Sequence, residues 1–418
     1  MPACIVTLEV TASKRLIEKA HADALKEVGK EVILPGFRKG KAPIDLIQRQ
    51  FSTSIADKGK KLLADYAFAS AFKLAAIPIL NDRSSINFKL NKISEEEASF
   101  TFSYETEPLP PTIDPKKFVL QPVQKQVIGE KEMGEALKQM QMFFAKWTLI
   151  ADRPVQEGDY ILIDLETNED PPKKIFSDTR FEVSDSHMAT WMKKLVLGKK
   201  PGDICEGISE ADPDMSEEQK KAFLPKRVLL TLKKIETAEL PPFDDDFAKK
   251  VGGKTMDDVR KFVKEMLENK AEEAFQGKQR EQVSQFLLQH PFYLPVSLMR
   301  QEIEHRKTQL QADPRYQHKL KQMTDLERAV EKMQVEEAIS KQSEGALRIF
   351  YASRQIIRDN QIPITQEEVE KEALNTLKTF GPVKIDPNKI PQEVMALALS
   401  KVILSKAQEY ILKNCLTN

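Results

Sequence analysis

The sequence predicts a multidomain α+β fold with an α+β N-terminal domain, a strand-rich middle domain and an all-α C-terminal domain. Three observations predict this class. The chain has 418 residues, a length typical of roughly two to four domains. Fifteen glycines and seven tyrosines are few for an all-β protein of this size, so the composition favours helix. The spacing of apolar residues changes from helical to alternating near residue 151, and back to helical near residue 241.

Composition and charge limit the classes of function. Lysine plus arginine equals aspartate plus glutamate at 64 each, so the net charge is zero and any nucleic-acid contact must be local. The three cysteines, Cys4, Cys205 and Cys415, are odd in number and far apart, which argues for a reducing compartment and against a disulfide framework or a zinc site. The start has no basic region followed by an apolar core, and no apolar run approaches the ~20 residues of a membrane span. We therefore expect a soluble, cytoplasmic protein with no membrane partner, metal or cofactor.

Residues 1–113 read as one α+β layer. A strand over 4–10 alternates apolar and polar residues, and Ser13 is placed to cap the helix that follows. A short helix over 44–51 and a longer helix that ends at Ile77-Pro78 come next. Two alternating segments, 85–93 and 98–106, predict a hairpin that completes the domain.

A basic turn interrupts this domain between the first two helices. It reads Gly36-Phe37-Arg38-Lys39-Gly40-Lys41-Ala42-Pro43, and its two glycines and proline exclude a regular helix. One aromatic residue and three cations lie between the helix breakers. The simpler interpretation is a solvated turn between helices. The functional interpretation is a surface that contacts something acidic outside the protein.

Residues 114–150 are predicted to be a linker and the first part of a helical body that residues 241–418 complete, so that residues 151–240 are an insertion in it. Pro108-Leu109-Pro110-Pro111 predicts a stiff, extended linker just before them. A short strand-like stretch over 118–127 precedes a helix over 130–146, which carries Met133, Leu137, Met140 and Phe144 at helical spacing. Such a methionine-rich face suits a packed core, or a surface that accepts many partners. Periodicity leaves both interpretations open.

Residues 151–240 have the pattern of a sheet domain. A turn at 156–159 leads into a strong strand at 160–165, a second turn lies at 197–203, and a final strand runs over 227–235. Residues 241–418 return to helical spacing. Thr255 with Asp258 and Thr365 with Glu368 are capping-box patterns that begin two of the helices. Helices are also predicted at about 324–359 and 391–413, and the acidic run at 244–246 suits a helix N-terminus.

The basic turn resembles a known signature. Gly-Phe-Arg-x-Gly-x-x-Pro, about forty residues from the N-terminus, is similar to the ribosome-docking motif of the trigger factor family. The resemblance implies that Gly36, Phe37, Arg38, Lys39, Gly40, Lys41 and Pro43 contact the large ribosomal subunit beside the exit tunnel. The resemblance also implies that nascent and unfolded polypeptides are partners and that helical arms expose apolar grooves to them. Formation of a homodimer away from the ribosome is a further possibility.

The middle domain resembles the FK506-binding-protein (FKBP) fold of peptidyl-prolyl isomerases. The resemblance implies an apolar pocket from Leu165, Phe181 and Trp191, although the family's Asp-aromatic-x-Gly is here Asp164-Leu165-Glu166-Thr167, and the loop over 211–226 has no tyrosine. Rotation about a prolyl bond faces a barrier of ~18–20 kcal/mol. An apolar site lowers this barrier by favouring the less polar twisted amide, so catalysis requires no metal, nucleophile or general base. His187 is therefore interpreted as a surface helix residue.

Three functions remain for comparison. The leading hypothesis is a ribosome-associated chaperone that carries a weakened isomerase domain. The alternative is a free peptidyl-prolyl isomerase whose helical regions recruit substrate. A plain RNA-binding protein is disfavoured by zero net charge and by the absence of strands that combine basic and aromatic residues.

Overall fold

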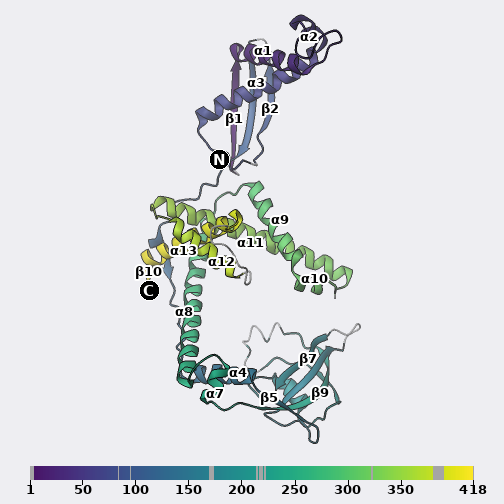
Figure 1. The fold of residues 1–418 in the computed structure, drawn as a ribbon, viewed down its shortest axis with the longest axis vertical. Helices are drawn as coiled ribbons and strands as arrows, with labels where there is room; N and C mark the ends of the chain where they lie inside the picture. Colours follow the sequence, from purple (N-terminus) through teal and green to yellow (C-terminus); the bar gives the residue numbers. More distant parts are fainter. Residues whose placement is uncertain are drawn as a thin grey trace. The chain divides into compact units, whose positions relative to one another are not determined.

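A computed structural model of the chain describes residues 4–82, 84–94, 96–168, 174–212, 215, 220, 223–321, 323–379 and 390–417. The chain forms two compact units (Figure 1). One unit comprises residues 1–123 and 277–418, and the other comprises residues 124–276. Helix and sheet are both present, as the sequence predicts.

The first unit begins with a three-stranded antiparallel sheet in the order β1-β3-β2. Its strands are β1 (Ile5–Ser13), β2 (Asn87–Ile93) and β3 (Glu97–Glu105). Alternate residues of β3 are buried, Phe100 and Phe102 among them, and they pack against the helices. Helices α1 (Lys14–Glu31) and α3 (Ser52–Ala75) lie along this sheet, and α2 (Ile44–Gln50) lies near one end (Figure 1).

The prediction that Ser13 caps α1 is right about its position and wrong about its side chain. Ser13 occupies the N-cap position of α1, but its side chain makes no capping hydrogen bond. Ser13 is also the last residue of β1, where it pairs with Glu97 across the sheet. Its backbone therefore completes the strand, and the helix begins without help from the hydroxyl.

The second unit contains a five-stranded antiparallel sheet in the order β5-β9-β6-β7, with β8 paired to β9. The strands are β5 (Lys146–Ile150), β6 (Tyr160–Thr167), β7 (Lys174–Glu182), β8 (Ile204–Ile208) and β9 (Arg227–Glu239). Gly158 and Gly202 have φ of +87° and +95°, so the two predicted turns use the conformation that glycine adopts without strain. The core packs one face of the sheet against α5 (Thr190–Val196).

The first strand of this sheet lies ahead of residue 151. Residues of β5 pair with β9 from Lys146 opposite Glu239 to Ile150 opposite Ile235. A domain that began at residue 151 would leave Thr237, Ala238 and Glu239 of β9 without a partner strand. We therefore propose residues 146–240 as the middle domain, which shortens the preceding segment to residues 114–145 and leaves the other boundaries as given above.

A small helical cluster accompanies the sheet in the second unit. It joins α4 (Glu130–Phe143), α7 (Asp245–Lys250) and the first half of α8 (Met256–Leu288). Leu137 is buried there, and Met133 and Met140 pack beside it, so the methionine-rich face of α4 is core. The predicted capping box at the start of α8 is confirmed, because Thr255 and Asp258 exchange hydrogen bonds of 3.1 and 3.3 Å.

Helices also form the remainder of the first unit. They are the end of α8, α9 (Val296–Ala312), α10 (Pro314–Lys321), α11 (Asp325–Asp359), α12 (Gln366–Thr379) and α13 (Gln392–Asn414). Their core includes Phe118, Phe286 and Ile411. The strand expected over 118–127 is limited to β4 (Val119–Leu120), which pairs with β10 (Leu416–Thr417). The partner strand is two residues long, so only two residues of the segment can pair.

Two ion pairs join α12 to α13, Lys401 with Glu372 at 3.4 Å and Lys406 with Glu368, and the second makes a pH-dependent prediction. Thr365 and Glu368 form the predicted capping box, and Lys406 of α13 lies 2.7 Å from the Glu368 carboxylate. The hydrogen bond from Lys406, followed by the backbone of Thr365, lowers the pKa of Glu368 to about 2. Because the folded pKa lies below the unfolded value, this stabilisation is present above about pH 4.5 and is lost as the pH falls through about 2.

We therefore expect Glu368→Gln to weaken the protection of α12 and α13 at neutral pH, and to flatten its decline below pH 4.5. Hydrogen exchange of the backbone amides in these helices measures the effect. Glu367→Gln is the matched control, since Glu367 is exposed in the same first turn. Equal exchange in the two variants at every pH would contradict the prediction.

Candidate functional sites

The basic turn is held open by its two glycines. Gly36 and Gly40 have φ of +88° and +78°, a left-handed conformation that other residues adopt at a cost. Backbone hydrogen bonds close two successive turns, from Phe37 N–H to Leu34 C=O at 3.1 Å and from Lys41 N–H to Arg38 C=O at 2.9 Å. Leu34 is buried with Ile47 and its neighbours below the turn, so the tip is anchored to the domain core.

The tip presents its functional groups to solvent. Phe37 is 40% exposed, and Arg38, Lys39 and Lys41 are also exposed. Among the described residues, no carboxylate forms an ion pair with any of these three cations. An aromatic ring and three uncompensated charges therefore stand together on a turn of fixed backbone. This arrangement suits an acidic partner such as a phosphate backbone.

The three residues expected in the isomerase pocket belong to one cluster, but they differ in exposure. Leu165 on β6 is 2% exposed and lies within the core of the middle domain. Phe181 on β7 and Trp191 on α5 are half-buried and pack against the same core. The rings of Phe176 and Phe181 meet edge to face with centroids 5.2 Å apart. Sequence reasoning did not single out Phe176, because it lies an odd number of residues before Phe181 and only the irregular pairing of β7 with β6, between Ile163 and Leu165, brings both rings to the core.

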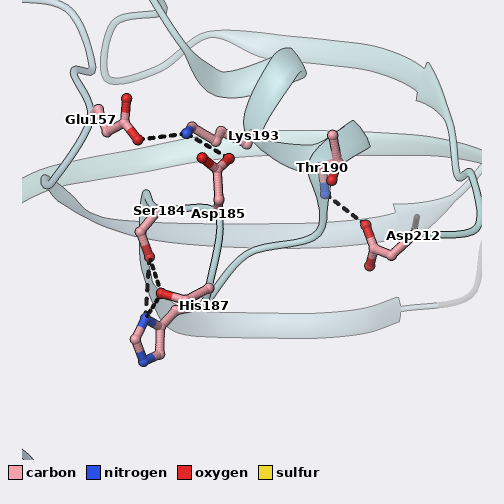
Figure 2. A network of polar contacts seen from close by, with 8 residues as sticks. Glu157, Ser184, Asp185, His187, Thr190, Lys193 and Asp212 are labelled. Carbon is pink, nitrogen blue, oxygen red and sulfur yellow. Dashed lines mark hydrogen bonds and ion pairs between the residues drawn. The ribbon is translucent and has the colours of Figure 1, made fainter. Parts of the chain in front are cut away.

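Polar contacts hold the segment around α5 in place (Figure 2). The ammonium group of Lys193 lies 2.7 Å from Glu157 and 2.8 Å from Asp185, and the backbone N–H of Thr190 donates to Asp212 at 2.8 Å. Asp212 comes from the loop over 211–226, of which residues 213–214, 216–219 and 221–222 lie outside the described residues. These contacts attach the first residue and the middle of α5 to neighbouring loops and so fix the helix that carries Trp191.

His187 is an exposed residue of a turn rather than of a helix. Its Nδ1 lies 2.9 Å from Ser186 Oγ and 3.2 Å from Ser184 Oγ (Figure 2). The helix of this segment begins at Thr190, three residues later. The sequence pattern misplaced the helix start because serine and aspartate around His187 favour local side-chain hydrogen bonds.

Exposed apolar residues follow one face of α11. Leu326 is 77% exposed, Val330 is 47% exposed and Met333 is 73% exposed, at spacings of four and three residues. Positions four and three apart lie on one side of a helix. The sequence analysis missed this stripe, although its i, i+4, i+7 spacing is visible in the sequence. Contiguous exposed apolar groups typically mark a binding surface.

Comparison with a solved structure places the whole chain in one class. A structure from a study of promiscuous substrate recognition in the folding and assembly activities of the trigger factor chaperone matches 99% of this chain and 98% of its own, with 18% identity and a TM-score of 0.51. This chain therefore shares the overall fold of that structure. In the described residues, no helix is both long and apolar enough to cross a bilayer.

Sequence comparisons identify the family. Residues 2–140 match the family model for bacterial trigger factor protein, and residues 255–412 match the model for its C-terminus. Together these matches cover more than half of the chain, and the chain belongs to the trigger factor family.

Relatives from several bacteria have similar length. The trigger factor of Protochlamydia amoebophila strain UWE25 is 29% identical over 417 residues, covering 97% of this chain and 93% of the relative. The trigger factor of Chlamydia trachomatis serovar L2 is 27% identical, with 98% and 93% covered. That of Carboxydothermus hydrogenoformans is 24% identical, with 98% and 96% covered.

Proposed function

We propose that the chain is a ribosome-associated chaperone that docks on the large subunit beside the exit tunnel and shields emerging apolar segments. The single observation that carries the docking proposal is the basic turn. Gly36 and Gly40 set its backbone, and Phe37 with three exposed cations forms its tip. Membership of the trigger factor family supports the same role.

Exposed helix faces support the binding of unfolded chains. Besides the stripe on α11, Phe262 and Met266 on α8 are 63% and 47% exposed. Apolar segments of a client could cover such faces without a specific sequence, because hydrophobic burial is not directional. Homodimer formation away from the ribosome remains a further proposal.

We also propose that the middle domain is a weak peptidyl-prolyl isomerase. The support is the family, which is generally associated with this activity, and the aromatic residues Phe176, Phe181 and Trp191 around one core. The alternative function, a free isomerase with helical recruiting regions, differs in one observable. Only the ribosome-docking chaperone should pellet with ribosomes, and co-sedimentation of the full chain tests this directly.

Deleting the middle domain tests whether chaperone action belongs to the rest of the chain. Because β5 is part of the sheet, the deletion should remove residues 146–240 and join the ends with a short glycine-serine bridge. We propose that this domain is an insertion in the helical body, and insertions are tolerated when their ends lie close together. We expect a helical protein that still suppresses aggregation of a denatured client in a light-scattering assay.

The matched control is a deletion of 151–240, which keeps β5 without its partner strand. We expect the control to be less soluble, because β5 would expose an unpaired edge. An unfolded or inactive product from the 146–240 deletion would show that the helical part depends on the sheet.

A further inference from the structure

Two β-bulges meet at one point of the middle sheet. On one side of β6, the strand β7 places two residues, Ser177 and Asp178, opposite the single residue Asp164. On the other side, β9 carries one extra residue, Lys233, between the partners of two consecutive β6 residues. Bulges bend a strand and redirect its side chains, and they are frequent beside active sites. The place where both neighbours of β6 depart from regular pairing is therefore a candidate for a functional role.

Three charged side chains tie the two bulges together. The Asp164 carboxylate accepts a hydrogen bond from the backbone N–H of Asp178 at 2.8 Å through Oδ1, and Lys233 Nζ lies 2.8 Å from its Oδ2. The same ammonium group lies 2.6 Å from Asp178 Oδ1. Lys233, followed by the backbone of Asp178, lowers the pKa of Asp164, so this carboxylate is ionised at neutral pH. The Asp164 side chain is only 17% exposed, and partly buried pairs are weakly screened by salt.

Asp178 needs this support because of its backbone conformation. Its φ of +48° lies in the left-handed region, which disfavours residues other than glycine. Such a conformation persists only where the surrounding structure holds it in place. Asp164 holds the backbone of Asp178 and Lys233 holds its side chain, so the network stabilises the bulge of β7.

The bulge of β7 decides where the Phe176 ring lies. Phe176 and Phe181 are five residues apart, an odd separation that places side chains on opposite faces of a regular strand. The extra residue returns both rings to the core face, where they meet edge to face with centroids 5.2 Å apart. Phe176 is the cross-strand partner of Leu165, and Phe181 is the partner of Ile161. An aromatic ring therefore stands beside the position at which Leu165 replaces the family's aromatic residue.

We propose that Asp164 and Lys233 are positioning residues of the isomerase domain. They fix the bulge at Asp178 and so keep the Phe176 ring beside Phe181, where the two rings form an aromatic wall for the proline of the substrate. The inference rests on the proposed isomerase function and adds to it the contacts that hold one wall of the pocket.

Replacing the central carboxylate tests the proposal in the full-length protein. Asp164→Val removes the acceptor and the ion pair while keeping a side chain suited to a strand. We expect kcat/KM for an Xaa-Phe-Pro peptide to fall about tenfold, the order by which the left-handed region disfavours a residue other than glycine. We also expect the nuclear Overhauser contact between the rings of Phe176 and Phe181 to disappear. Deuterated protein with protonated phenylalanine rings shows this contact, and Phe176→Leu assigns it.

A glycine at the bulge separates positioning from general stability. Because glycine adopts the left-handed conformation without strain, Asp164→Val with Asp178→Gly should return to within about twofold of the wild-type kcat/KM and regain the ring contact. A general loss of stability would instead be deepened by a glycine within the strand. Lys233→Met is a milder variant that keeps the bond from Asp178 N–H to Asp164, in case Asp164→Val does not fold. It should lower kcat/KM about threefold, and Asp178→Gly should reverse that loss.

Glu166→Val is the matched control. Glu166 lies two residues after Asp164 on the same face of β6 and pairs with Lys174 at 3.5 Å, so the change removes an ion pair without touching the bulge at Asp178. The control should match wild type in turnover and in ring contact.

Four results would overturn the proposal: full turnover in Asp164→Val, a persistent ring contact in that variant, an equal loss in Glu166→Val, or no recovery with Asp178→Gly in either background. Absence of turnover in the wild-type chain would instead count against the isomerase activity itself. The ring contact would then decide alone whether Asp164 positions Phe176.

Discussion

Replacing Phe37, Arg38 and Lys39 together with alanine is expected to abolish co-sedimentation with ribosomes. The substitutions remove the aromatic ring and two of the three exposed cations of the tip, and they leave Gly36 and Gly40 in place. Surface substitutions usually change stability by about 0.5 kcal/mol or less each, so the fold should persist. Pelleting assays with the full chain measure the loss.

Salt dependence adds a second observable for the same turn. If the three cations each contact about one phosphate, a fourfold rise in salt weakens binding roughly 20- to 40-fold, taking the slope for counterion release. The variant keeps Lys41, but a single cation releases too few counterions to reproduce this dependence of binding on salt.

A matched control tests whether an exposed aromatic residue and two cations elsewhere in the domain contribute equally to ribosome binding. Phe88, Lys89 and Lys92 on β2 are exposed in the same domain and give a triple alanine variant of like composition. We expect this control to pellet as wild type does. If the variant of the turn also pelleted like wild type, the docking proposal would fail.

The middle domain is expected to turn over a short Xaa-Phe-Pro peptide at least roughly a hundredfold more slowly than an isomerase with the complete family pocket. Leu165 stands where the family has an aromatic residue and Thr167 where it has glycine, and both are buried. Each 1.36 kcal/mol of lost stabilisation of the twisted amide lowers the rate about tenfold, so two such losses account for the factor. A prolyl-isomerisation assay of the full chain measures it.

Paired tryptophan variants assign the remaining turnover to one face of the sheet. Trp191→Ala should reduce the residual rate further, because Trp191 and Phe181 both pack against the core of the middle domain. Trp147→Phe should leave it unchanged, because Trp147 packs on Tyr160, which is not part of that core. Turnover at the full family rate would show that the losses at Leu165 and Thr167 are overrated.

Local patterns were sufficient for most elements of the fold. The capping boxes at Thr255 and Thr365 begin helices where predicted, because the two hydrogen bonds of such a box involve residues only three apart. The strand at 118–127 and the cap at Ser13 were predicted wrongly. In both cases the partner strand decides the outcome: β10 pairs with only two residues, and Glu97 keeps Ser13 in the sheet.

The candidate sites divide in the same way. The basic turn was found in the sequence because its residues are contiguous and its glycines indicate a left-handed backbone conformation. The cleft between α4 and the sheet of the middle domain was not found, since Met142, Trp147, Tyr160 and Glu182, which line it, come from four elements. No window of sequence contains that arrangement.

By itself, the sequence determined the order of the α+β, strand-rich and helical regions, the family signature at Gly36–Pro43 and the zero net charge, since each depends on composition or on residues close in the chain. Only the tertiary structure decided that β5 joins the middle sheet, that the methionine-rich face of α4 is core, and that Tyr160 on β6 contacts both Trp147 of β5 and Glu182 of β7. These depend on strand pairing and helix packing between distant segments, which periodicity along the chain does not encode.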